Sequence, residues 1–135
     1  MTMTLRAVLN RTPKSRKFSS QWVKFKDIKL GRHKVTNAPV IRAKSHSTHN
    51  KDGVRKNYTP NEYVSTVEIH GRYVVLSCSC DDFWAVWEVA LAAQGAARVE
   101  YSNGDRPIER NPGMLAGCCK HLYRLGERLI EKGKL

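Results

Sequence analysis

The sequence lacks any long hydrophobic run and has a mean hydropathy of −0.52. No apolar stretch approaches the roughly 20 residues that a membrane-spanning helix needs. The first residues also lack the apolar core of a secretory signal peptide. We therefore expect no membrane partner and a reducing, cytoplasmic compartment, where the protein associates with a nucleoid or nucleoprotein, or with a host cell or virion if its source is viral.

Acidic residues are scarce in one part of the chain. The 135 residues contain 24 Lys and Arg against 12 Asp and Glu, a formal net charge of +12. Residues 1–60 hold fifteen of the basic residues and only two acids, Asp27 and Asp52, whereas residues 61–135 have a net charge of −1. The chain therefore divides into a basic arm with strands at 1–60 and a nearly neutral domain at 61–135. A hydrophobic content of 41% excludes full disorder.

This charge asymmetry predicts a polyanion partner, because cations that neutralise phosphates gain affinity by releasing counterions. The alternative is a solvated leader that improves solubility. Phe18, Trp22 and Phe25 lie among the cations and either stack on bases or, for Trp22 and Phe25, face the core. The residues expected to contact nucleic acid are Arg11, Lys14, Arg16, Lys17, Lys24, Lys26, Lys29, Arg32, Lys34, Arg42 and Lys44.

Local patterns predict an α+β fold. Alternating apolar residues at 63–69 and β-branched residues at 72–77 flank a His70-Gly71 turn and indicate a β-hairpin. Helical spacing of apolar residues predicts a helix at 82–93, capped by the preceding aspartates, and a last helix at about 117–131.

The N-terminal half gives weaker signals. Short alternating or β-branched segments at 22–26, 28–30 and 40–42 are candidate strands, and 45–60 has the polar composition of a loop.

Four cysteines supply the clearest chemistry. They occur as Cys78-Ser-Cys80 and Cys118-Cys119-Lys-His121. In a reducing compartment, clustered cysteines beside a histidine indicate a metal more often than a disulfide. Alternate residues of a strand share a face, so Cys78 and Cys80 can both turn toward one tetrahedral zinc ion.

This pattern resembles the SWIM zinc finger, Cys-x-Cys followed by Cys-x-His. The matching residues are Cys78, Cys80, Cys119 and His121, and the resemblance covers about 61–132. It implies a ββα core around one structural Zn²⁺, in a small stand-alone member with a basic N-terminal half. Two features depart from the family: 38 residues separate the two motifs, and Cys118 offers a competing thiolate. Because Cys119 keeps the motif's register, we assign Cys118 to packing.

Catalytic patterns are absent. Four protein ligands leave a zinc ion no open position, and the chain has no P-loop, Gly-x-Ser-x-Gly or His-Glu-x-x-His motif. His46 and His49 have a metal-like spacing, but polar loop residues surround them. We therefore expect neither an enzyme nor a small-molecule substrate.

Two functions fit these observations. One is a zinc-stabilised nucleic-acid-binding accessory protein in a larger recombination, replication or transcription complex of a microbe or virus. The other is a non-enzymatic structural or adaptor protein, whose SWIM unit contacts a protein in a nucleoprotein or virion assembly. The family's association with DNA transactions favours DNA over RNA, whereas the residues themselves leave the type of nucleic acid and its strandedness open.

Overall fold

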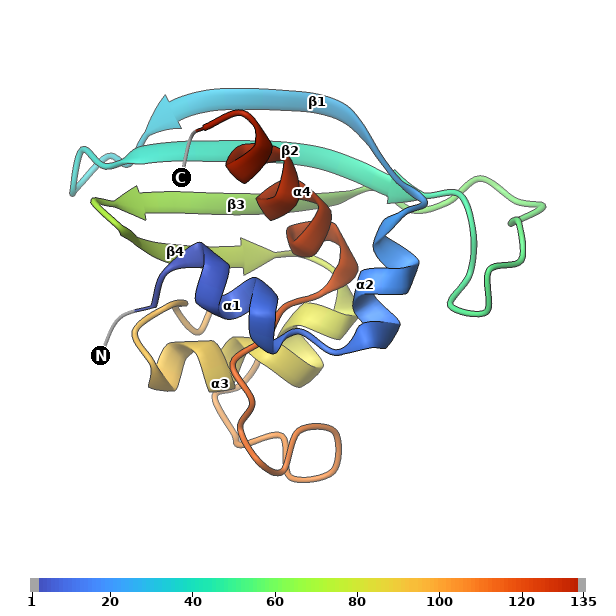
Figure 1. Cartoon of the computed structure of the whole chain (residues 1–135). Coiled ribbons are helices and arrows are strands. Elements are labelled where there is room, and N and C mark those ends of the chain that lie inside the picture. Colours follow the sequence, from blue (N-terminus) through green and yellow to red (C-terminus); the bar gives the residue numbers. More distant parts are fainter. Residues whose placement is uncertain (1–2, 134–135) are drawn as a thin grey trace.

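Four strands form one antiparallel sheet in the computed structural model, which describes residues 3–133 (Figure 1). The strands are β1 (Val23–Arg32), β2 (Pro39–Ser47), β3 (Tyr63–His70) and β4 (Tyr73–Cys78), and they neighbour one another in chain order. The predicted hairpin is confirmed as β3 and β4, joined through Gly71 at a φ of +66°. Because β2 pairs with β3, segments on both sides of residue 60 share one sheet.

Strand β1 contains a β-bulge. Phe25 lies opposite Ser45 and Asp27 opposite Lys44, so Lys26 is an extra residue without its own partner. The two short strands predicted at 22–26 and 28–30 are therefore one continuous strand. Strand β2 also extends to Ser47, three residues into the segment predicted as a loop.

Helix α4 (Lys120–Glu131) covers one face of the sheet (Figure 1). Its stripe of Leu122, Leu125 and Leu129 is buried, as the sequence predicts. The helix begins three residues later than expected because Cys119 has extended backbone angles, φ −75° and ψ 168°. Across residues 3–133, no helix has both the length and the apolar character needed to cross a bilayer.

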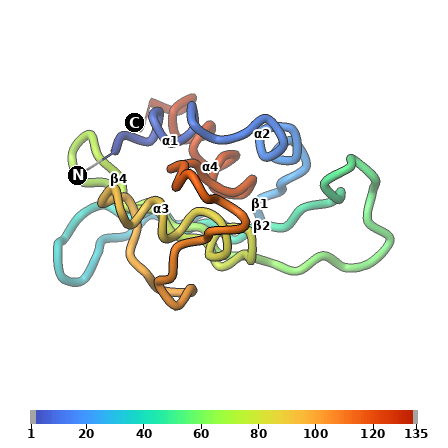
Figure 2. Tube along the Cα trace, turned by 90° about the horizontal axis from the view of Figure 1, so that it is seen from below, coloured from blue at the N-terminus to red at the C-terminus, as the bar shows by residue number. Residues whose placement is uncertain are grey.

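Two N-terminal helices, which the sequence pattern did not reveal, pack beside α4. They are α1 (Leu5–Arg11) and α2 (Lys14–Ser20), and Figure 2 shows them on the same side of the sheet as α4. At Gly126 in α4, an added Cβ would lie 3.0 Å from a Leu9 methyl. The glycine that weakens the isolated helix thus permits the close approach of α1.

The helix predicted at 82–93 is present in two segments. A π-helical turn, η1 (Phe83–Trp87), leads into α3 (Glu88–Ala93). Asp82 does not cap it; its carboxylate accepts hydrogen bonds from Arg16 at 2.6 and 3.1 Å and from the Trp87 indole at 3.2 Å. The predicted cap residue therefore ties α2 to η1.

Candidate functional site

Three cysteines and one histidine meet where β4 ends and α4 begins. Cys78 is the last residue of β4, and Cys80 follows two residues later on the same, covered side. Cys119 immediately precedes α4, and His121 is the second residue of that helix. All four are buried, and their sulfur and nitrogen ligand atoms lie within 4.8 Å of one another. The structure thus brings together the four predicted ligands.

This cluster has the dimensions and the chemistry of a metal site. A tetrahedral zinc ion with bonds of about 2.0–2.3 Å separates its ligand atoms by roughly 3.3–3.8 Å, which a span of at most 4.8 Å accommodates. Both ring nitrogens of His121 are buried without a hydrogen-bond partner among residues 3–133. An unpaired buried imidazole costs free energy, which coordination through one nitrogen would remove. The four residues can hold one metal ion.

The surroundings of the sulfur atoms also suit a cation. Ser65 donates a hydrogen bond of 3.3 Å to the Cys78 sulfur from the neighbouring strand. Burial, together with the sulfurs of Cys78 and Cys80, raises the pKa of the Cys119 thiol well above its ordinary value. Three thiolates in so small a volume repel one another, and a divalent cation at their centre offsets that repulsion.

Cys118 lies outside the metal cluster and packs against α1. Its backbone N–H donates to the Thr12 hydroxyl at 3.1 Å, and its sulfur lies 3.4 Å from the same oxygen. Burial raises the pKa of the Cys118 thiol to about 12, so the group stays neutral. The preceding Gly117 permits this contact, because a Cβ there would lie 3.1 Å from the Thr12 Cα. These contacts match the packing role assigned to Cys118.

One of the two other candidate histidine ligands, His49, is engaged elsewhere. His49 stacks on Trp22 with ring centroids 4.8 Å apart, and its Nδ1 lies 2.8 Å from the Thr48 hydroxyl. Trp22 also meets Phe18 edge-on at 5.0 Å. Of the three rings considered for base stacking, Phe18 and Trp22 therefore pack on each other, whereas the Phe25 ring lies 5.1 Å from the Arg128 guanidinium.

The predicted nucleic-acid-binding residues occupy two regions of the molecule. One group lies in the helices that flank α4: Arg11, Lys14, Arg16 and Lys17. The other lies in or between the first two strands: Lys24, Lys26, Lys29, Arg32, Lys34, Arg42 and Lys44.

The face of the sheet opposite α4, here called the open face, gathers four exposed cations. Cross-strand partners share a face, and the register places Lys29 opposite Arg42, while Lys44 lies two pairs further along and so on the same face. Lys24 continues the row beyond Lys44. One acid, Asp27, lies among them and contacts the Lys29 ammonium at 3.4 Å.

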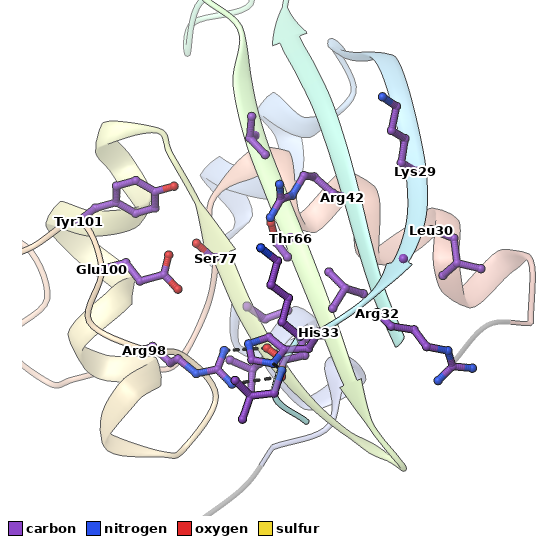
Figure 3. Close-up of a pocket in the computed structure, with 18 residues that line it drawn as sticks. Lys29, Leu30, Arg32, His33, Arg42, Thr66, Ser77, Arg98, Glu100 and Tyr101 are labelled. Carbon is purple, nitrogen blue, oxygen red and sulfur yellow. Dashed lines mark hydrogen bonds and ion pairs between the residues drawn. The ribbon is translucent and has the colours of Figure 1, made fainter. Parts of the chain in front are cut away.

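A hollow of about 940 Å³ lies on the open face (Figure 3). Lys29 and Arg42 border it on the side of β1 and β2, and Thr66 and Ser77 lie at its centre on β3 and β4. Tyr101 borders the opposite side, in the segment between α3 and α4. No periodic pattern connects this loop to the sheet, so Tyr101 was missed.

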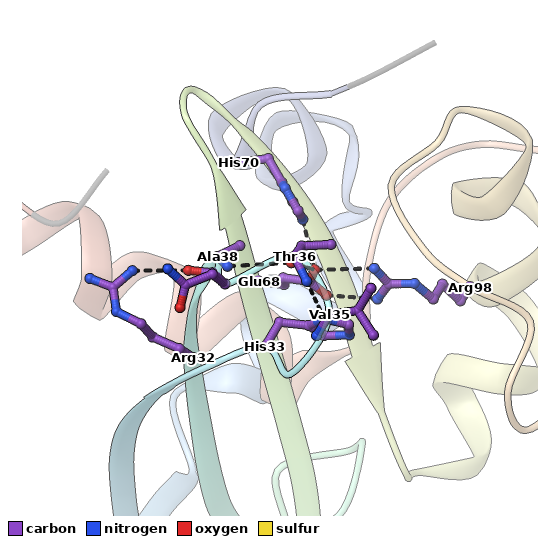
Figure 4. Close-up of polar contacts among 9 residues, drawn as sticks. Arg32, His33, Val35, Thr36, Ala38, Glu68, His70 and Arg98 are labelled. Atoms are coloured by element: carbon purple, nitrogen blue, oxygen red, sulfur yellow. Dashed lines mark hydrogen bonds and ion pairs between the residues drawn. The ribbon is translucent and has the colours of Figure 1, made fainter.

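A polar network around Glu68 closes one end of the hollow (Figure 4). The Glu68 side chain is only 4% exposed and receives hydrogen bonds from Arg98 at 2.6 and 3.1 Å. The His70 ring lies 2.7 Å from the same carboxylate, and Thr36 donates to it at 3.4 Å. The network joins β3 to the β1–β2 turn and to the segment after α3.

Replacing Glu68 by Gln is expected to lower the free energy of unfolding by about 1–3 kcal/mol at neutral pH, because an amide cannot pair with the Arg98 charge. The hydrogen bonds from Arg98 lower the pKa of Glu68 from 4.5 to about 2. The pKa of Glu68 is lower in the folded protein than in the unfolded chain. The stabilisation by the carboxylate is therefore complete above pH 4.5 and is lost as the pH falls through about 2. Urea denaturation of the unaltered protein and of Glu68→Gln should show a difference in the free energy of unfolding that narrows toward about pH 2. A difference that does not change with pH contradicts the stabilising role of the Glu68 charge.

Comparison with known proteins finds no matching protein-family model, no matching curated protein and no matching solved structure. What the chain shares with the SWIM pattern is therefore the cluster of Cys78, Cys80, Cys119 and His121 itself.

Proposed function

We propose that this protein is a zinc-stabilised, non-enzymatic nucleic-acid-binding accessory protein of a larger DNA- or RNA-processing complex, and that its open face makes the contact. The open face, opposite α4, carries Lys24, Lys29, Arg42 and Lys44. DNA is the favoured nucleic acid, because the Cys-x-Cys and Cys-x-His pattern resembles that of the SWIM finger, a family associated with DNA transactions.

The observation that carries the proposal is the placement of Lys29 directly opposite Arg42. Like charges in directly opposed positions destabilise a sheet. Asp27 offsets part of this repulsion at Lys29, and a chain of phosphates along the row would neutralise the remaining charge and release counterions at each contact. Lys44 and Lys24 continue the row, so several consecutive phosphates could be neutralised.

The cations of the helical side support the same choice of face, because part of that group is already engaged. Arg16 forms the ion pair with Asp82 and lies 5.3 Å from the Trp87 ring centroid. The Lys17 ammonium lies 5.9 Å from the ring centroid of Tyr123. These contacts fasten α2 to the core, so we assign these two residues a packing role.

Zinc is the metal we assign to the cluster. Three thiolates and an imidazole form a soft, nitrogen-containing donor set of the kind that selects zinc. Four protein ligands complete a tetrahedron and leave no position for substrate or water, which supports a structural rather than a catalytic role.

The proposal is tested with two triple variants that remove the same charge. K29Q/R42Q/K44Q alters the open face, and R11Q/K14Q/K17Q alters the helical side. The affinity for labelled DNA and RNA is measured at several salt concentrations. The open-face variant should reduce the slope of log K against log[salt] by about 2–3 and weaken binding at least about tenfold at low salt, whereas the helical variant should change the slope by less than about one.

Three outcomes would count against this function. Absence of binding by the unaltered protein at low salt removes nucleic acid as the partner. Equal losses in the two variants show that total charge, and not the open face, determines affinity. A larger loss in R11Q/K14Q/K17Q moves the contact to the helical side.

A further inference from the structure

We propose that the hollow on the open face binds a single strand of nucleic acid, with its sugar–phosphate backbone along β1 and β2 and a base against Tyr101. This inference rests on the proposed function and specifies the strandedness of its ligand, which the sequence left open.

The two sides of the hollow differ in chemistry. Lys29 and Arg42 lie on one side, and the ring of Tyr101 lies on the other (Figure 3). A single strand has the same asymmetry, since its charged backbone runs along one edge and its base faces are open along the other. A duplex instead stacks its bases internally and presents phosphates on both strands. The hollow therefore matches the single strand.

Glu100 reinforces this preference. It is exposed and borders the hollow beside Tyr101 (Figure 3). A second phosphate backbone on that side would meet its carboxylate, which repels it. The other acid of the lining, Glu68, already receives hydrogen bonds from Arg98, so its charge is compensated.

The floor of the hollow offers polar groups to a base or sugar. Thr66 and Ser77 lie directly opposite each other in the register of β3 and β4, and both are half-buried. Hydroxyl groups can both donate and accept, so they can pair with the edges of different bases without selecting one sequence. About 940 Å³ lies near the upper end of the roughly 300–1,000 Å³ typical of small-molecule pockets, so the hollow has room for more than one nucleotide.

Tyr101 is held in place rather than free. Its backbone N–H donates to the Glu88 carboxylate at 3.2 and 3.3 Å, and the N–H of Ser102 donates to the same group at 2.9 Å. Glu88 itself is completely buried in α3. A fixed backbone lowers the entropy that the loop loses on binding, so a stacked base gains more from the Tyr101 ring.

The test compares Tyr101→Leu with Tyr101→Phe, which keeps the ring. Fluorescence anisotropy measures binding of labelled oligo(dT), oligo(rU) and a DNA duplex of the same length. We expect the unaltered protein to bind a single strand more tightly than the duplex. Tyr101→Leu should weaken single-strand binding about 5- to 150-fold, the range for loss of one base–aromatic stack, with little change for the duplex. Tyr101→Phe should keep most of the affinity.

The outcomes separate this inference from the proposed function. Equal or tighter duplex binding, or unchanged single-strand binding by Tyr101→Leu, overturns the single-strand assignment while nucleic-acid binding stands. No binding of any oligonucleotide overturns the proposed function as well. If Tyr101→Leu does not fold, Glu100→Lys provides the same test: the preference for single strands over duplex should narrow, and an unchanged preference contradicts the inference.

Discussion

Removal of the metal is expected to unfold this protein. The cluster joins the end of β4 to the start of α4, and α4 in turn contacts all four strands as well as α1 and α2. Metal binding by a small zinc domain contributes of order 10 kcal/mol to folding, which is comparable with the roughly 5–15 kcal/mol total stability of a small protein. Circular dichroism under reducing conditions should show loss of the cooperative melting transition after a strong chelator, and its recovery when zinc is restored.

Two adjacent cysteines provide a matched control for this prediction. Cys119→Ala removes a ligand, whereas Cys118→Ala removes an equally buried sulfur that lies against Thr12. The first variant should abolish stoichiometric metal binding and the melting transition. The second should retain one metal ion per chain and lose about 1–2 kcal/mol of stability. Equal behaviour of the two variants, or folded protein without metal after dialysis, contradicts the assignment.

Replacing Glu88 by Ala is expected to cost about 3–5 kcal/mol, because it leaves two backbone N–H groups without their acceptor and opens a cavity in the core. The side chain is completely buried and anchors Tyr101 and Ser102 to α3. Urea denaturation measures the loss, and hydrogen exchange should show faster opening at 99–105. Glu88→Gln keeps one carbonyl acceptor of similar shape and should lose less than half as much.

If the free energy of unfolding of Glu88→Ala lies within about 1 kcal/mol of that of the unaltered protein, other contacts hold the loop at 99–105. A loss of stability without faster exchange at 99–105 would place the role of Glu88 in the packing of α3. Either outcome would also weaken the argument that Tyr101 is preorganised.

Local sequence signals predicted the parts of the structure that depend on near neighbours. The β3–β4 hairpin follows from alternation around Gly71, and the leucine stripe of α4 follows from helical spacing. The four metal ligands could be predicted because each motif is local. Cys-x-Cys places two ligands at the end of one strand, and Cys-x-His places two at the start of one helix. The start of α4 was placed too early, since spacing alone does not show that Cys119 is extended.

Other parts depend on contacts between distant segments and left no local signal. Helices α1 and α2 have seven residues each, too short to be stable alone, and their packing beside α4 stabilises them. The place of Tyr101 beside the sheet depends on Glu88, thirteen residues away, and on the path of the loop between them. Charge counting found the basic residues but could not show that they separate onto two sides of the molecule.

The bulge in β1 determines which residues the strand presents to each side. Before the bulge, Phe25 shares its face with Ser45, and beyond it Ile28 shares that face with Ala43. Ile28 comes three positions after Phe25, whereas in a regular strand residues on one face are separated by an even number of positions. Lys29 reaches the open face because Lys26 is left unpaired in the bulge and does not take a place in the alternation. If the same residues alternated regularly from Phe25 with Lys26 paired, the strand would turn Lys29 toward α4 and Ile28 outward. The electrostatic character of the open face therefore depends on the register of one strand, because a single unpaired residue shifts the alternation of all the residues that follow it by one position.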